Sequence, residues 1–75
     1  MKKTYYIILA KPDQSLYLKY FSNSRYSSTT DKLEKAKHYS KLETAIKTRD
    51  SLVERGVYPN CKILELEVSV NEVIA

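Results

Sequence analysis

Glycine is nearly absent from this sequence, since Gly56 is the only one in 75 residues. A phosphate-cradling P-loop and a dinucleotide-binding fingerprint each need several glycines to let the backbone approach the phosphates, so both are excluded. Histidine and cysteine are equally scarce, since His38 is the only histidine and Cys61 is the only cysteine. A lone cysteine excludes an internal disulfide, and this pair cannot supply the three or four ligands of a zinc site. We therefore expect no metal and no cofactor.

Long apolar runs are also missing, and none approaches the ~20 residues of a membrane-spanning helix. The first ten residues begin like a signal peptide, with Lys2 and Lys3 before an apolar stretch. That stretch is too short, however, and residues 11–13 interrupt it without a small-residue cleavage site. We therefore expect a cytoplasmic protein that does not enter a membrane. The length allows one core, so residues 1–75 are predicted to form a single domain.

The clearest pattern in the chain is an amphipathic helix over residues 40–56. Its apolar positions recur at the spacing of one helical face, at Leu42, Ala45, Ile46, Leu52 and Val53. Ser40 followed by Glu43 predicts a capping box at the start of the helix, and Gly56 predicts a left-handed residue that ends it. The apolar face of this helix must be covered, and we predict that a small sheet covers it.

Three segments are typical of β-strands, at residues 4–10, 15–21 and 61–70. The first is an unbroken β-branched and aromatic run, and we expect it at the centre of the sheet. In the second, alternation places Leu16, Leu18 and Tyr20 on one face and Tyr17, Lys19 and Phe21 on the other. The third alternates apolar residues at 64, 66, 68 and 70 with Glu65, Glu67 and Ser69, and Ile63 is the exception on its polar side.

Two weaker elements complete the expected fold. We predict a short edge strand at residues 25–27. We also predict a short helix over residues 32–38, with Asp31 as the residue that caps its start. The predicted fold class is α+β, a three- or four-stranded, mostly antiparallel sheet with the short and the long helix packed on one face. The expected order is strand, strand, edge strand, short helix, long helix, strand.

Catalytic signals are weak. His38 lies among lysines and is interpreted as a surface side chain, and Glu65 with Glu67 is interpreted as a solvated sheet face rather than a catalytic carboxylate pair. The serines and threonines at 27–30 have no base beside them in the sequence. We predict a protein that is not an enzyme, and a minimal enzyme that uses His38 is the least favoured alternative.

Positive charge is concentrated in residues 32–49, which carry six basic and two acidic residues in a chain of net charge +4. Such a surface attracts acidic partners and does so less at high salt. The alternative interpretation is an ordinary lysine-rich, solvated helix surface.

Tyrosine is the second unusual feature, because seven of the eight aromatic residues are tyrosines. Exposed tyrosine favours contact surfaces, since its ring supplies apolar area and its hydroxyl a polar tip. With the basic segment this predicts a partner-binding surface made of Tyr17, Lys19, Tyr26, Lys35, Lys37, Tyr39, Lys41 and Lys47. Nucleic-acid or nucleotide binding by stacking on an aromatic sheet face, and a homodimer, stay open as alternatives.

The running pattern resembles small proteins encoded by bacteriophages and prophages of Gram-positive bacteria. Residues 3–8, 16–19, 29–36, 42–45 and 62–65, together with Tyr39, carry this resemblance. The resemblance implies a non-enzymatic accessory protein in the host cytoplasm that binds and modulates or inhibits a host protein, including one of host defence. It implies no functional residues. The leading hypothesis is therefore a small binding protein that occupies an acidic surface of such a partner.

Overall fold

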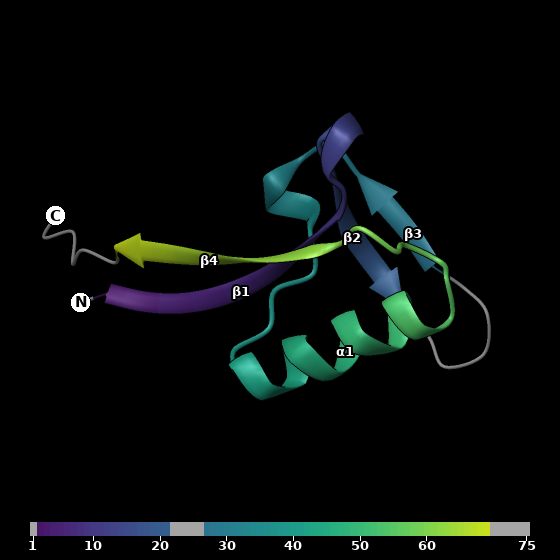
Figure 1. The fold of residues 1–75 in the computed structure, drawn as a ribbon. Helices are drawn as coiled ribbons and strands as arrows, with labels where there is room; N and C mark the ends of the chain where they lie inside the picture. Colours follow the sequence, from purple (N-terminus) through teal and green to yellow (C-terminus); the bar gives the residue numbers. More distant parts are fainter. Residues whose placement is uncertain (1, 22–26, 70–75) are drawn as a thin grey trace, which may run out of the picture.

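The computed structural model describes residues 2–21 and 27–69. Within these ranges the chain forms four strands, two short 3-10 turns and one α-helix. In chain order these are β1 (Lys2–Lys11), η1 (Pro12–Gln14), β2 (Leu16–Phe21), β3 (Ser27–Thr30), η2 (Leu33–Lys35), α1 (Leu42–Glu54) and β4 (Lys62–Ser69). The strands form one antiparallel sheet in the order β3-β2-β1-β4 (Figure 1). The predicted small α+β fold is confirmed, and so is the interior position of β1.

The unbroken apolar run of β1 is explained by burial on both faces of the sheet. Ile7 and Ile8 are neighbours that point to opposite faces, and their exposed fractions are 1% and 0%. Ile8 packs against Ala45 and Leu52 of α1 in the core. Ile7 is paired with Leu64 of β4 on the other face. A strand that is covered on both faces has no need of a polar side, so its sequence shows no alternation.

The core lies between the sheet and α1. Its buried members come from β1, β2, α1 and two connecting segments, and they are Ile8, Ala10, Leu18, Tyr39, Ala45, Leu52 and Cys61. Ala45 and Leu52 are the buried residues of α1, whereas Leu42 and Val53 keep 43% and 44% of their surface exposed. The apolar stripe of the helix is therefore narrower in the structure than its sequence pattern predicts.

The two ends of α1 differ from each other in how well they follow the sequence. The helix begins at Leu42, because Lys41 is still extended (φ −119°, ψ 130°) and no side chain caps the first turn. The capping box predicted from Ser40 and Glu43 is therefore wrong.

The C-terminal end of α1 follows the prediction. Gly56 has a left-handed backbone with φ of 69°. Its N–H donates to the carbonyl of Val53 at 3.1 Å, and the N–H of Val57 donates to the carbonyl of Leu52 at 3.1 Å. These two bonds make a Schellman motif, which satisfies carbonyls that the helix leaves unpaired.

The predicted short helix over residues 32–38 is wrong beyond the single turn of η2. After that turn the chain is extended, because the sheet binds its backbone. The N–H of Lys37 donates to the carbonyl of Leu18 at 2.8 Å, and Tyr39 exchanges two hydrogen bonds of 2.8 Å with Tyr6. Residues 37–39, which we call the link, thus lie beside both β1 and β2. These backbone groups are not available to a helix.

The link carries the chain from one face of the sheet to the other. In Figure 1, η2 lies above the β1–β4 ribbon and α1 lies below it. The ring of His38 contacts the ring of Tyr5 with centroids 5.6 Å apart, on the face opposite Tyr6 and the core. The expectation that both helices pack on one face is therefore wrong.

A bulge in β2 changes which residues face the core. The register between β2 and β3 shifts between Leu18 and Tyr20. As a result Leu18 and Phe21, which differ by three positions, both pack in the core, while Tyr20 is 52% exposed. The predicted faces of this strand are wrong from Tyr20 onward. The predicted edge strand lies at β3, slightly later than expected, and residues 25 and 26 lie outside the described ranges.

The β1–β4 ribbon projects past α1 at the end where both strands reach the chain termini (Figure 1). Its register runs from Lys2 opposite Ser69 to Leu9 opposite Lys62. Ile63 is opposite Ile8 and packs against the core on the α1 side. The apolar residues at 64, 66 and 68 therefore lie on the face away from α1. Val70, the last residue of the predicted strand, lies outside the described ranges.

Candidate functional site

A surface hollow of about 280 Å³ gathers three of the predicted partner-binding residues. It lies between the link and the middle of α1, with the end of β2 beside it. Its lining residues are Phe21, Lys37, Tyr39, Lys47, Thr48 and Ser51. We call it the Lys37–Lys47 hollow.

The link presents Lys37 and Tyr39 on the same side of the extended backbone, since residues two apart share a face. Hydrogen bonds to Leu18 and Tyr6 fix the backbone at both positions. The ammonium of Lys37 lies 5.5 Å from the centre of the Tyr39 ring, a cation–π contact that orients the long lysine side chain. The sheet thus holds one wall of the hollow in place.

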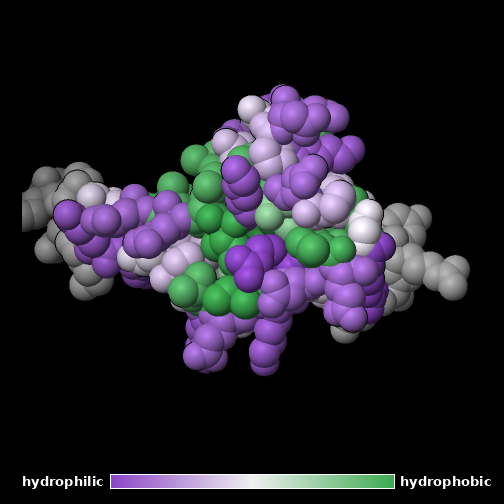
Figure 2. Space-filling model, viewed as in Figure 1, coloured by the Kyte–Doolittle hydropathy of each residue, from purple (hydrophilic) through white to green (hydrophobic). Residues whose placement is uncertain are grey.

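The opposite wall is one face of α1. Lys47 and Ser51 are four residues apart, so they are neighbours on the helix surface, and Thr48 lies beside them. The hydroxyl of Thr48 donates to the carbonyl of Thr44 at 3.0 Å. Hydrophilic side chains project from α1 away from the sheet in Figure 2, while apolar side chains gather at the centre of that view.

The hollow carries charge of one sign. Among the described residues that line it, Lys37 and Lys47 are the charged ones, and none of them carries a carboxylate. Lys2 forms an ion pair with Glu67 and Arg49 forms one with Asp50, and neither lysine of the hollow is in an ion pair with another described residue. Two ammonium groups beside the hydroxyl of Ser51 are suited to an anion such as a carboxylate or a phosphate, whereas the O–H of Thr48 is already donated to Thr44.

Tyr39 has a different role from the one that we predicted. Its exposed fraction is 7%, so its ring belongs to the core rather than to a contact surface. Burial raises the pKa of its hydroxyl, and a hydrogen bond with Thr48 opposes that change. Tyr39 therefore supports the floor of the hollow and stays neutral at physiological pH.

The other predicted site residues do not meet at this hollow. Lys41 is exposed just before α1, and Lys35 is exposed on η2, on the far side of the sheet. Tyr17 is paired with Leu9 and shares its face, so Tyr17 also lies on the side away from α1. Lys19 is exposed at the bulge of β2, away from the lining of the hollow. Tyr26 lies outside the described ranges. The predicted single surface is thus divided between two faces of the sheet.

Three residues of the hollow were not predicted. Thr48 and Ser51 carry a usable signal, because they lie next to Lys47 and one turn after it on the same helix. Phe21 carries none, since only the bulge in β2 turns it toward the core.

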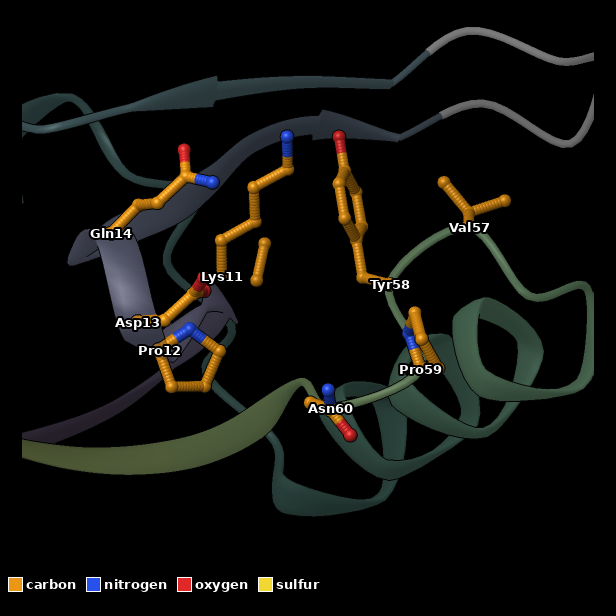
Figure 3. A pocket seen from close by; sticks show the side chains of 9 residues that line it. Lys11, Pro12, Asp13, Gln14, Val57, Tyr58, Pro59 and Asn60 are labelled. Atoms are coloured by element: carbon orange, nitrogen blue, oxygen red, sulfur yellow. The ribbon is translucent and has the colours of Figure 1, made fainter.

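A second hollow, of about 220 Å³, lies between η1 and residues 57–60 (Figure 3). Lys11 and Tyr58 stand side by side in it, with the ammonium 6.0 Å from the ring centre. The Tyr58 hydroxyl is 3.0 Å from the hydroxyl of Ser27. Asp13 brings a carboxylate to the same lining. Because its charges are of both signs and its aromatic is already bonded, this hollow is a weaker anion site than the first.

The residues considered for catalysis lie apart from both hollows. His38 is exposed against Tyr5, and Cys61 is buried with its thiol 3.8 Å from the carbonyl of Arg49.

Over residues 2–21 and 27–69, no three His, Cys, Asp or Glu side chains gather as metal ligands, and no helix has the length and apolar character to cross a membrane. Comparison with family models, curated proteins and solved structures gives no match.

Cys61 leads to a prediction about stability at alkaline pH. Burial raises the pKa of its thiol above the ordinary value of 9.0, so the folded protein holds this proton more tightly than the unfolded chain does. As the pH rises past 9.0 the unfolded chain ionises first, and the free energy of unfolding is expected to fall. Urea unfolding between pH 8 and pH 10, under reducing conditions, measures this fall. The Cys61→Ala variant should lose less stability over the same pH interval. An equal loss would show that the Cys61 thiol does not cause the fall.

Proposed function

We propose that this chain is a non-catalytic binding protein whose Lys37–Lys47 hollow receives acidic side chains of a protein partner. One observation carries the proposal, the convergence of two lysines on a hollow whose described lining has no carboxylate, with neither lysine in an ion pair among the described residues. The exposed Lys41 before α1 extends the positive surface beyond the hollow. The resemblance to small bacteriophage proteins supports a host protein as the partner, one that the chain inhibits by occupying its surface.

The physical basis is a charge-assisted contact on a prepared surface. A carboxylate between two ammonium groups gains a hydrogen bond from each, and such bonds are roughly twice as strong as neutral ones. The link and α1 already hold the two lysine backbones, so binding has only side-chain rotamers to order. Both ammonium groups are solvated before binding, so we expect a weak contact per carboxylate and a useful affinity only for an acidic cluster.

Titration with an acidic peptide tests the proposal. We expect labelled hexaglutamate to bind at about 0.01 M salt, where the Debye length is ~30 Å, and to dissociate at about 1 M salt, where it is ~3 Å. Hexaglutamine is the matched neutral control and should not bind at either salt concentration. Equal binding of the two peptides, or binding that salt does not weaken, would contradict an electrostatic contact.

Nucleotide binding is the second candidate, because an aromatic residue lies in the same hollow. Phe21 packs partly against the core and also lines the hollow beside the two lysines. A base would stack on the ring while the phosphates meet the ammonium groups. ATP should then bind more tightly than inorganic triphosphate, whereas equal affinities would show that the ring contributes nothing.

A further inference from the structure

The outer edge of β4 is open in the part of the chain that the structure describes. β4 is the last strand in the sheet order, and its eight residues pair with β1 on one side only. An unpaired edge presents a row of N–H and C=O groups that another extended chain can join. Many sheets protect such an edge with a proline, a bulge or a very short strand, and β4 has none of these.

The register fixes which backbone groups of β4 point outward. Along an antiparallel strand, the N–H and C=O of one residue point to the same side, and those of the next residue point to the other side. Both groups of Tyr6 bond to Tyr39, away from β4. Tyr6 is opposite Glu65, so the backbone groups of Glu65 point away from β1. The same alternation directs those of Ile63 and Glu67 to the open edge.

The two faces along this edge have opposite character. Glu65 and Glu67 lie on the face of β4 that Ile63 shares, beyond the contact of Ile63 with the core. Apolar side chains lie on the other face, and Leu64 and Val68 are each 37% exposed. Lys2 is 3.2 Å from Glu67, but both side chains are more than half exposed, so this ion pair is weak. A basic residue of a partner can therefore replace Lys2 beside Glu67.

We propose that the β4 edge accepts an extended segment of another protein as an added antiparallel strand, in which basic residues alternate with apolar residues. The basic residues would lie on the face of Glu65 and Glu67, and the apolar residues would continue the apolar surface of Leu64 and Val68. Backbone hydrogen bonds supply affinity in such β-augmentation, and alternate side chains supply specificity. The sheet would then have five strands and a covered edge.

Charge favours this partner over a second copy of the chain. In the two antiparallel self-pairings that overlap most of β4, Glu65 is opposite Glu65 of the second copy or opposite its Glu67. Like charges directly opposite each other destabilise a strand pair. A basic segment replaces this repulsion by attraction, and it leaves the Lys37–Lys47 hollow uncovered.

Peptide binding measured by fluorescence anisotropy tests the proposal. The probe alternates lysine with valine over about seven residues, the length of an ordinary strand. Two controls have related compositions, one with glutamate in place of lysine and one with the lysines and valines in separate blocks. We expect the alternating basic peptide to bind at least about tenfold more tightly than either control. Only this peptide places its lysines on the face of Glu65 and Glu67 and its valines on the face of Leu64 and Val68. Equal binding of the blocked peptide would overturn the proposal, since that would be charge attraction alone.

Backbone methylation separates strand addition from side-chain contact. In an antiparallel added strand, the residues opposite Glu65 and Glu67 direct their N–H groups at β4, and these residues are the lysines of the peptide. N-methylation at the lysines should abolish binding, whereas N-methylation at the valines should preserve it. The reverse result would overturn the antiparallel arrangement, and two peptides that both bind or both fail would overturn strand addition.

Charge reversal in the protein provides the complementary test. The E65K/E67K variant should lose the basic peptide and gain the acidic one, each by about tenfold, which a general loss of structure would not produce. The E34K/E54K variant has the same change of net charge at exposed residues outside β4 and should bind like the parent protein. Unchanged peptide preference in E65K/E67K would overturn the proposal.

Discussion

Replacing Leu52 by alanine should lower the free energy of unfolding by about 2–5 kcal/mol, the usual cost of emptying a buried leucine site. Leu52 is completely buried and joins α1 to Leu18 and Ile8 of the sheet. A domain of 75 residues is stable by roughly 4–11 kcal/mol, so this one change removes a large part of the total. Thermal unfolding followed by circular dichroism should show the midpoint falling by about 10 °C or more.

Val53→Ala is the matched control for that experiment. Val53 follows Leu52 in the same helix but is 44% exposed. Alanine also has the higher helix propensity, so this change should alter stability by no more than about 0.5 kcal/mol. If Val53→Ala cost as much as Leu52→Ala, the packing of α1 on the sheet described above would be wrong.

Reversing both charges of the hollow should have the largest effect on binding. In the K37E/K47E variant, an acidic partner meets two carboxylates where the parent protein has two ammonium groups. Like charges brought together at an interface cost several kcal/mol, so we expect the affinity for hexaglutamate to fall by about a hundredfold. Both side chains are exposed and neither is in an ion pair with another described residue, so the fold should tolerate the change, which removes only the cation–π contact of Lys37 with Tyr39.

The K3E/K62E variant controls for net charge, because it changes the charge by the same amount at two exposed lysines of the β1–β4 ribbon. It should lose only the small, long-range part of the attraction, which is screened over about 8 Å at physiological salt. Equal losses in the two variants would mean that the protein attracts acidic peptides by its overall charge and that the hollow has no special role.

The local parts of the fold could be predicted from the sequence. The amphipathic pattern gave α1, Gly56 gave its C-terminal motif, and the unbroken apolar run of β1 gave its interior position. Each of these features depends on residues close together in the chain, or on a burial pattern that a single strand records by itself.

The parts that failed depend on contacts between distant segments. Ser40 and Glu43 have the sequence of a capping box, but Lys41 is extended and takes the position before the first helical residue, so Ser40 lies one residue too early to cap the helix. Backbone hydrogen bonds from the link to β1 and β2 replace the predicted helix after η2 and bring the chain across the sheet. The bulge between Leu18 and Tyr20 has no marker such as a glycine, so the faces of β2 were assigned by simple alternation.

Only part of the candidate site could be predicted, because its position also depends on contacts between distant segments. Counting charge identified Lys37 and Lys47, because excess lysine is visible in the sequence without any knowledge of the fold. The charge count did not show that Lys37 and Lys47 line one hollow whereas Lys35 and Lys19 lie outside it. The abundance of tyrosine suggested exposed rings, but burial of Tyr39 shows that a tyrosine in so small a domain also serves the core.

The most direct test of the Lys37–Lys47 hollow is the change in backbone amide chemical shifts as hexaglutamate is added to isotope-labelled protein. We expect the largest changes in the link and in residues 47–51 of α1, and we expect these changes to disappear in K37E/K47E. Binding at this hollow would be contradicted if the largest changes lay in η1, in the second hollow or along β4, or if no changes appeared at a saturating peptide concentration.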